Sequence, residues 1–196
     1  MRCRIPFYII FCLCCLGCSG THRTPPPHDT VEVGLLAIDS NETTVESDTA
    51  IAIEGFEYLD FAATDFLHDT LAHLSDLIEG HVALVDFWAS WCRPCRQIIR
   101  DRLHEVYEEY RDQGVVLVGV AVQDDSAALA RAIDDLDITW PQLYDSHGEA
   151  VDTYNLLSIP HLMLISANGT VLAWDLHVAA IEAAIDNALA IDESSN

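Results

Sequence analysis

The chain contains 196 residues, of which 51% are hydrophobic, so it can bury a core and is neither disordered nor collagen-like. Its nine basic residues are all arginine and face 32 acidic residues, which gives a formal net charge of −23. Such an excess of negative charge repels phosphate groups, which excludes nucleic acid as a default partner and disfavours docking on anionic membranes. The lack of lysine fits either adaptation to high salt or a biased base composition, and both alternatives stay open.

The amino terminus has the pattern of an export signal. Two arginines precede an apolar run of about a dozen residues, which is shorter than the ~20 that a membrane-spanning helix needs. The run ends at Gly17-Cys18 and resembles the bacterial lipoprotein signal, although Cys15 stands where leucine is usual. We therefore expect residues 1–18 to be a signal peptide that leaves Cys18 lipidated, on the periplasmic or extracytoplasmic face of the cell envelope. A cleaved cysteine-rich leader and an uncleaved short anchor are the alternatives.

The rest of the chain divides by composition. Residues 19–55 are rich in proline and acidic residues and read as a flexible tether, residues 56–190 as a folded domain, and residues 191–196 as a tail. In the domain, apolar and turn patterns predict strands at 82–87, 115–122, 162–165 and 171–174, and helices at 94–113, 126–136, 151–157 and 178–189. Asn168-Gly169 predicts a two-residue hairpin turn, Ser126 a helix cap and Gly114 a helix end. This order predicts an α/β fold, a mixed β-sheet with helices on both faces.

Two cysteines stand apart from the other five. The leader holds Cys3, Cys12, Cys14, Cys15 and Cys18, so the domain keeps only Cys92 and Cys95, too few for a structural disulfide framework. Cys95 continues the apolar stripe of the 94–113 helix and should face inward, whereas Cys92 lies at the helix entry. Free backbone N–H groups and the helix dipole should favour the thiolate form of Cys92, and Pro94 fixes the turn. The pattern indicates an attacking cysteine with a sheltered resolving partner.

Four arginines surround this pair. Arg93, Arg96, Arg100 and Arg102 lie within ten residues and should favour a thiolate, although the last three also fit a solvated helix face. A zinc site would need further ligands at a recognised spacing, and a purely structural bridge would close too short a loop to stabilise much. We therefore expect redox cycling, with no metal and no cofactor other than the Cys92–Cys95 disulfide.

The segment Asp86-Phe87-Trp88-Ala89-Ser90-Trp91-Cys92-Arg93-Pro94-Cys95 resembles the active-site segment of thioredoxins. Ser158-Ile159-Pro160-His161 resembles the cis-proline loop of the same fold, and residues 74–77 and 122–157 resemble the TlpA/ResA branch. The resemblance covers about residues 56–190 and implies a thioredoxin-like three-layer fold. Members of this branch are exported, often membrane-anchored thiol-disulfide oxidoreductases.

The resemblance also implies a role for each matching residue. Cys92 would be the nucleophile, Cys95 the resolving thiol, and Asp86 a buried carboxylate that assists proton transfer at Cys95. Trp91 would shield the disulfide and Trp88 would pack beneath it.

On the substrate side, Pro160 would be cis, and the Ile159 backbone would pair with an extended substrate segment. Pro94 and Arg93 would face the substrate as well. Arg93 stands where thioredoxins carry glycine, and a cation there should raise the reduction potential. His161 lies close to this loop but receives no role.

With this resemblance we expect an envelope enzyme that reduces protein disulfides and acts as a monomer. The resemblance further implies exported substrates, for example in cytochrome c maturation, and a membrane thiol donor of electrons. The main alternative is a non-catalytic binding module, whose peptide binding would survive replacement of both cysteines. A thiol peroxidase is less favoured because that class places threonine and proline ahead of a single reactive cysteine. A copper chaperone of this fold would have three residues between its cysteines.

Overall fold

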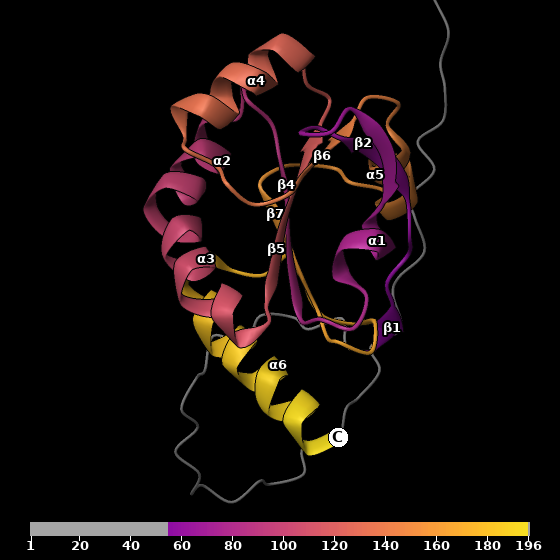
Figure 1. The fold of residues 1–196 in the computed structure, drawn as a ribbon, viewed down its shortest axis with the longest axis vertical. Helices are drawn as coiled ribbons and strands as arrows, with labels where there is room; N and C mark the ends of the chain where they lie inside the picture. Colours follow the sequence, from indigo (N-terminus) through magenta and orange to yellow (C-terminus); the bar gives the residue numbers. More distant parts are fainter. Residues whose placement is uncertain (1–54, 196) are drawn as a thin grey trace, which may run out of the picture. The chain divides into compact units, whose positions relative to one another are not determined.

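The computed structural model describes residues 55–195, which form one eight-stranded sheet flanked by helices (Figure 1). Cys18, the expected signal peptide and nearly all of the expected tether lie outside the described residues. The order of strands across the sheet is β1-β8-β7-β4-β5-β6-β2-β3. Strands β4, β5 and β6 run parallel, and the strands on either side pair antiparallel to them. The predicted mixed sheet with helices on both faces is therefore confirmed.

The elements follow one another closely along the chain. The strands are β1 (Phe56–Glu57), β2 (Ala62–Asp65), β3 (Thr70–His73), β4 (Ala83–Trp88), β5 (Val116–Val122), β6 (Gln142–Asp145), β7 (His161–Ile165) and β8 (Thr170–Trp174). The helices are α1 (Leu74–Ile78), α2 (Arg93–Ile98), α3 (His104–Tyr110), α4 (Ser126–Asp135), α5 (Glu149–Tyr154) and α6 (Ile181–Ser195). A π-helical segment, Ile99–Leu103, joins α2 to α3, and short 3-10 turns follow α3 (Arg111–Gln113) and precede α6 (Val178–Ala180). Among the described residues, no helix is both long and apolar enough to cross a membrane.

The helices cover the two faces of the sheet unequally. Helices α2, α3, α4 and α6 lie on one face, and α1 and α5 lie on the other (Figure 1). Strand β4 contributes to the cores on both faces of the sheet, because successive side chains of a strand point to opposite faces. Leu84 and Trp88 pack with the cysteines under α2, whereas Val85 and Phe87 pack into the opposite core. Position 86 therefore faces the α2 layer.

Most of the predicted elements form, with shifted ends. The predicted 94–113 helix is a run of helical segments from Arg93 to Gln113, and Gly114 ends it in the left-handed conformation. The π-helical segment inside it was not predicted. Asp125, rather than Ser126, caps α4, because its carboxylate accepts a 2.9 Å hydrogen bond from the Ala128 N–H. The last helix continues to Ser195 and so includes residues that composition assigned to a tail.

The hairpin between β7 and β8 differs from the predicted two-residue turn. Residues 166–169 form a four-residue loop, closed by a 2.9 Å bond from the Ser166 N–H to the Thr170 carbonyl. Gly169 takes a positive φ of 89°, while the Ser166 hydroxyl donates to the Asn168 side chain. The β2–β3 hairpin, which extends the sheet beyond β6, was not predicted.

Candidate redox site

The site is built where β4 ends and α2 begins. Cys92 and Cys95 form a disulfide, with their Cα atoms 5.3 Å apart. Cys92 is the N-cap of α2, and its Sγ accepts a hydrogen bond from the Cys95 N–H at 3.2 Å. Cys92 is 4% exposed and Cys95 is fully buried. The sulfur at the helix entry is thus the one closer to solvent, as the sequence pattern predicted.

Arg93 and Pro94 are the first two residues of α2, and both are exposed. Pro94 occupies a position where an N–H would have no partner within the helix, so it costs no hydrogen bond. Free N–H groups and the positive end of the helix dipole stabilise a negative charge on the Cys92 sulfur when the disulfide is opened. The arrangement favours Cys92 as the thiolate that attacks.

Asp86 lies in the middle of β4, on the α2 face of the sheet. It is 1% exposed, and its Oδ1 has no hydrogen-bond partner. Burial raises the pKa of Asp86 to about 8, because a charged carboxylate is poorly solvated there. A carboxyl with this pKa can take up and release a proton near neutral pH, which is what proton transfer at a buried thiol requires. Asp86 is thus a buried carboxyl that is mostly protonated at neutral pH.

The two tryptophans next to the disulfide differ in burial. Trp88 is fully buried in the same core cluster as both cysteines, whereas the Trp91 side chain lies on the surface at 60% exposure. The Trp91 indole N–H donates to the Gln123 carbonyl at 3.0 Å. That bond orients the exposed ring at the edge of the site.

The cis-proline loop lies close to Trp91. The Ile159–Pro160 peptide bond is cis, as predicted, and Trp91 and Ile159 line one shared hollow. Within residues 55–195, no backbone hydrogen bond involves Ile159. Its N–H and carbonyl are therefore available to an extended segment laid beside the disulfide.

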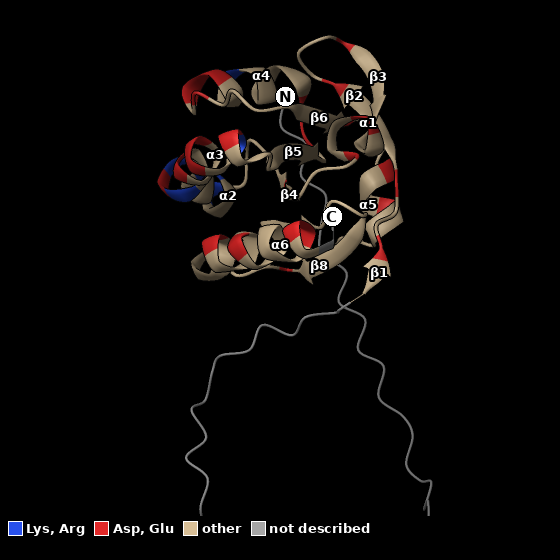
Figure 2. Ribbon diagram, turned by 60° about the horizontal axis from the view of Figure 1, so that its bottom comes forward, with Lys and Arg blue, Asp and Glu red and all other residues tan. Residues whose placement is uncertain are grey.

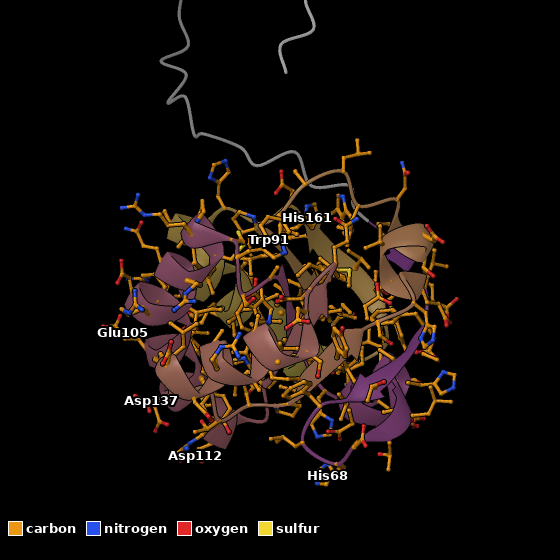
Figure 3. The ribbon with its side chains drawn as sticks, turned by 90° about the horizontal axis from the view of Figure 1, so that it is seen from above. His68, Trp91, Glu105, Asp112, Asp137 and His161 are labelled. Atoms are coloured by element: carbon orange, nitrogen blue, oxygen red, sulfur yellow. A yellow bond between two sulfur atoms is a disulfide. The ribbon has the colours of Figure 1, made fainter. Side chains whose placement is uncertain are left out.

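His161 follows the cis-proline, but its side chain packs away from the sulfurs. It is packed against the rings of Phe87 and Trp174 on the face of the sheet opposite Asp86. Burial lowers the pKa of His161, although Asp175, 3.6 Å away, acts in the opposite direction. In the view of Figure 3, His161 and Trp91 lie near each other and away from Asp112 and Asp137. His161 is part of an aromatic core rather than of the layer that holds the sulfurs.

Two supports of the site were missed by the sequence reasoning. The Asp124 carboxylate accepts hydrogen bonds from the Ser90 N–H and, at 2.6 Å, from the Ser90 hydroxyl, which ties the active-site loop to the end of β5. On β6, the buried side chain of Gln142 accepts the Trp88 indole N–H at 2.9 Å. The Gln142 side chain packs directly against Gly119: a Cβ atom at position 119 would lie 2.2 Å from the Gln142 Oε1. No local sequence signal marks either support, because the partners lie far apart in the chain.

Fold and site together define a thioredoxin-like α/β domain that carries a disulfide at the start of a helix. The AhpC/TSA family matches residues 55–173, and the chain belongs to that family. The thiol-disulfide oxidoreductase ResA of Oceanobacillus iheyensis is 35% identical over 98 residues, 50% of this chain and 50% of that protein. The thioredoxin-like protein YneN of Bacillus subtilis is 33% identical over 61% of this chain and 71% of that protein.

A solved structure agrees with these relatives. A putative thiol:disulfide interchange protein DsbE from Chlorobium tepidum is 28% identical and has a TM-score of 0.63. The match covers 69% of this chain and 97% of that one. The chain spans about half the length of the ResA protein that it matches. The resemblance to thioredoxin-like proteins of the ResA type, drawn from the sequence, is confirmed.

Proposed function

We propose that the chain is a thiol-disulfide oxidoreductase that reduces disulfides in exported proteins. The observation that carries this proposal is the Cys92–Cys95 disulfide at the entry of α2, with the cis Ile159–Pro160 bond beside it. The relatives named ResA and DsbE support the same reaction class. A binding module would not require a buried, raised-pKa Asp86 on the α2 face of the sheet.

The reaction needs two exchanges. In the reduced protein, the Cys92 thiolate attacks a substrate disulfide, a mixed disulfide forms, and one substrate sulfur leaves as a thiolate. The Cys95 thiol then loses its proton, with Asp86 as the proposed acceptor, and attacks the Cys92 sulfur. The second substrate sulfur leaves, and the Cys92–Cys95 disulfide is restored. Two electrons have passed to the substrate, and a dithiol donor must return them to the protein.

The setting is proposed from the sequence alone. Lipidation of Cys18 would tether the domain to a membrane at the extracytoplasmic face, where disulfides of exported proteins occur. The donor would be a membrane thiol protein and the substrates would include apocytochrome c. The domain would act as a monomer, with the disulfide as its only redox group.

The proposal is tested with the full chain and its two cysteine variants. The reduced protein should reduce a disulfide-bonded peptide with one peptide disulfide lost per Cys92–Cys95 disulfide formed, as counted by alkylation and intact mass. Cys92→Ser should abolish the reaction, and Cys95→Ser should accumulate the mixed disulfide through Cys92. Absence of exchange with any disulfide in the wild-type protein would refute the proposal. Rapid consumption of hydrogen peroxide in place of disulfide would indicate a peroxidase.

A further inference from the structure

Trp91, the residue before Cys92, lines two hollows of opposite character. One has a volume of about 300 Å³, and its lining is mostly apolar: Trp91, Val122, Gln123, Val151, Leu156, Leu157, Ser158 and Ile159. The other, with a volume of about 640 Å³, is lined by Ser90, Trp91, Arg93, Arg96, Gln97, Arg100 and Asp101. The first is apolar and includes the cis-proline loop, while the second carries three arginines and one aspartate. We call the second the cationic hollow.

The cationic hollow differs in charge from the rest of residues 55–195. Arginines gather over α2 and the helix that follows it, while acidic residues dominate elsewhere in the described domain (Figure 2). Arg93 and Arg100 are exposed and, among the described residues, make neither an ion pair nor a side-chain hydrogen bond. Arg96 donates to the Ser90 carbonyl at 3.3 Å and lies 3.8 Å from Asp135.

Two other arginines of the domain have acidic partners within it, whereas exposed Arg131 on α4 makes no ion pair among the described residues. Arg102 pairs with Glu105 and Glu182, and Arg111 pairs with Glu108 at 2.9 Å. In a protein with 32 acidic residues and nine basic ones, two arginines without an acidic partner beside the nucleophile leave uncompensated positive charge. That charge complements carboxylates brought in by another molecule.

We propose that the cationic hollow binds acidic residues that flank the reactive cysteine of a protein substrate. The inference rests on the proposed function, since it defines which disulfides this site would favour. An extended segment paired with Ile159 would fill the apolar hollow on one side of its cysteine and meet Arg93 and Arg100 on the other. A long phosphate polymer fits less well, because it would extend beyond the hollow over the acidic remainder of the domain.

The distance over which salt screens charges decides which charges of the domain affect a bound segment. At physiological salt the Debye length is about 8 Å, so the negative charge of the whole domain is largely screened while contacts inside the hollow persist. An exposed arginine–carboxylate contact changes an equilibrium by up to about five-fold. Two such contacts predict a preference of about ten-fold for an acidic over a neutral flank.

The test measures the rate at which the reduced full chain reduces four matched peptides, each with one cysteine held in a disulfide. All keep leucine on one side of the cysteine, and the other side carries either two glutamates or two glutamines, in both chain directions. At physiological salt we expect a glutamate peptide of one direction to react about ten-fold faster than its glutamine counterpart. Arg100→Gln should reduce that preference by about three-fold, and 1 M salt should abolish it.

Arg131→Gln is the matched control, because Arg131 is exposed on α4 and does not line the hollow. It should leave the preference unchanged. Equal rates for glutamate and glutamine peptides, or an equal effect of the two arginine variants, would overturn the inference while leaving the oxidoreductase intact. Absence of reaction with every peptide would instead refute the proposed function.

Glutathione disulfide, a small anionic substrate, tests whether the hollow recognises a peptide segment or negative charge alone. If Arg100→Gln slows reduction of glutathione disulfide as much as reduction of the glutamate peptide, the hollow recognises charge alone and the proposed peptide segment is wrong. If only the peptide is affected, recognition requires the segment that spans both hollows.

Discussion

Replacing Asp86 by asparagine should stabilise the oxidised domain, and the gain should grow with pH. An unfolded aspartate has a pKa of 3.8, whereas burial raises the pKa of Asp86 to about 8 in the folded chain. Between these values the folded state holds a proton that the unfolded state has released. Because stability falls with pH wherever the folded state binds more protons, the wild type loses stability as the pH rises from about 4 to about 8.

The size of the effect follows from the two pKa values. Each unit of difference corresponds to about 1.4 kcal/mol, so the raised pKa lowers the unfolding free energy of the wild type by about 4 kcal/mol at pH 7 and by about 6 kcal/mol well above pH 8. Asparagine is nearly the same size and carries no charge at any of these pH values. The Asp86→Asn difference in unfolding free energy should therefore increase by about 3 kcal/mol between pH 5.5 and pH 8.5.

The assay is denaturant unfolding of the oxidised protein at several pH values, followed by tryptophan fluorescence. Asp137→Asn is the matched control, because Asp137 is an exposed aspartate just beyond α4. A difference for Asp86→Asn that stays constant from pH 5.5 to pH 8.5 would show that Asp86 is not a protonated interior acid. The argument for its role in proton transfer would then fail as well.

Two further substitutions probe the surface and the support of the site. Arg93→Gly should lower the reduction potential by about 10–30 mV, because it removes an exposed cation that favours the reduced thiolate form. Equilibration with glutathione buffers measures this, and a potential identical to the wild type would refute the role of Arg93. Gly119→Ala should lower the unfolding free energy by about 1–3 kcal/mol, because the new Cβ displaces Gln142 from its bond to Trp88. In a Gln142→Ala background most of that cost should disappear, and a cost that persisted would point to a backbone clash instead.

The parts of the site that the sequence predicted are those that a short segment contains. The spacing of Cys92 and Cys95 on one helix turn and the stripe that continues from Cys95 to Ile99 are local, so periodicity alone placed one sulfur at the helix entry and the other inside. The cis geometry at Pro160 came from resemblance, because an Ile-Pro pair by itself is cis in only about one case in twenty.

What the sequence did not reveal are contacts between segments that lie far apart in the chain. Asp124 holds Ser90 across 34 positions, and Gln142 holds Trp88 across 54, so neither pair appears in any local window. The β2–β3 hairpin was missed for a related reason. Its strand Thr70–His73 is largely exposed and pairs at the edge of the sheet, so it lacks the apolar run that marks a buried strand.

The two sulfurs of the disulfide occupy opposite electrostatic surroundings, and this asymmetry orders the proposed reaction. Near Cys92 there are helix N–H groups and the exposed Arg93, which stabilise a thiolate before any partner binds. Cys95 is fully buried in the layer that Asp86 faces. The Asp86 carboxyl is mostly neutral below pH 8 and does not stabilise a thiolate at Cys95. Cys95 should therefore keep its proton until the mixed disulfide forms. The carboxylate form of Asp86, which is the minor form below pH 8, can then accept that proton, so that only one negative charge is buried at any time. The different surroundings of the two sulfurs thus make Cys92 attack first and Cys95 resolve the mixed disulfide afterwards.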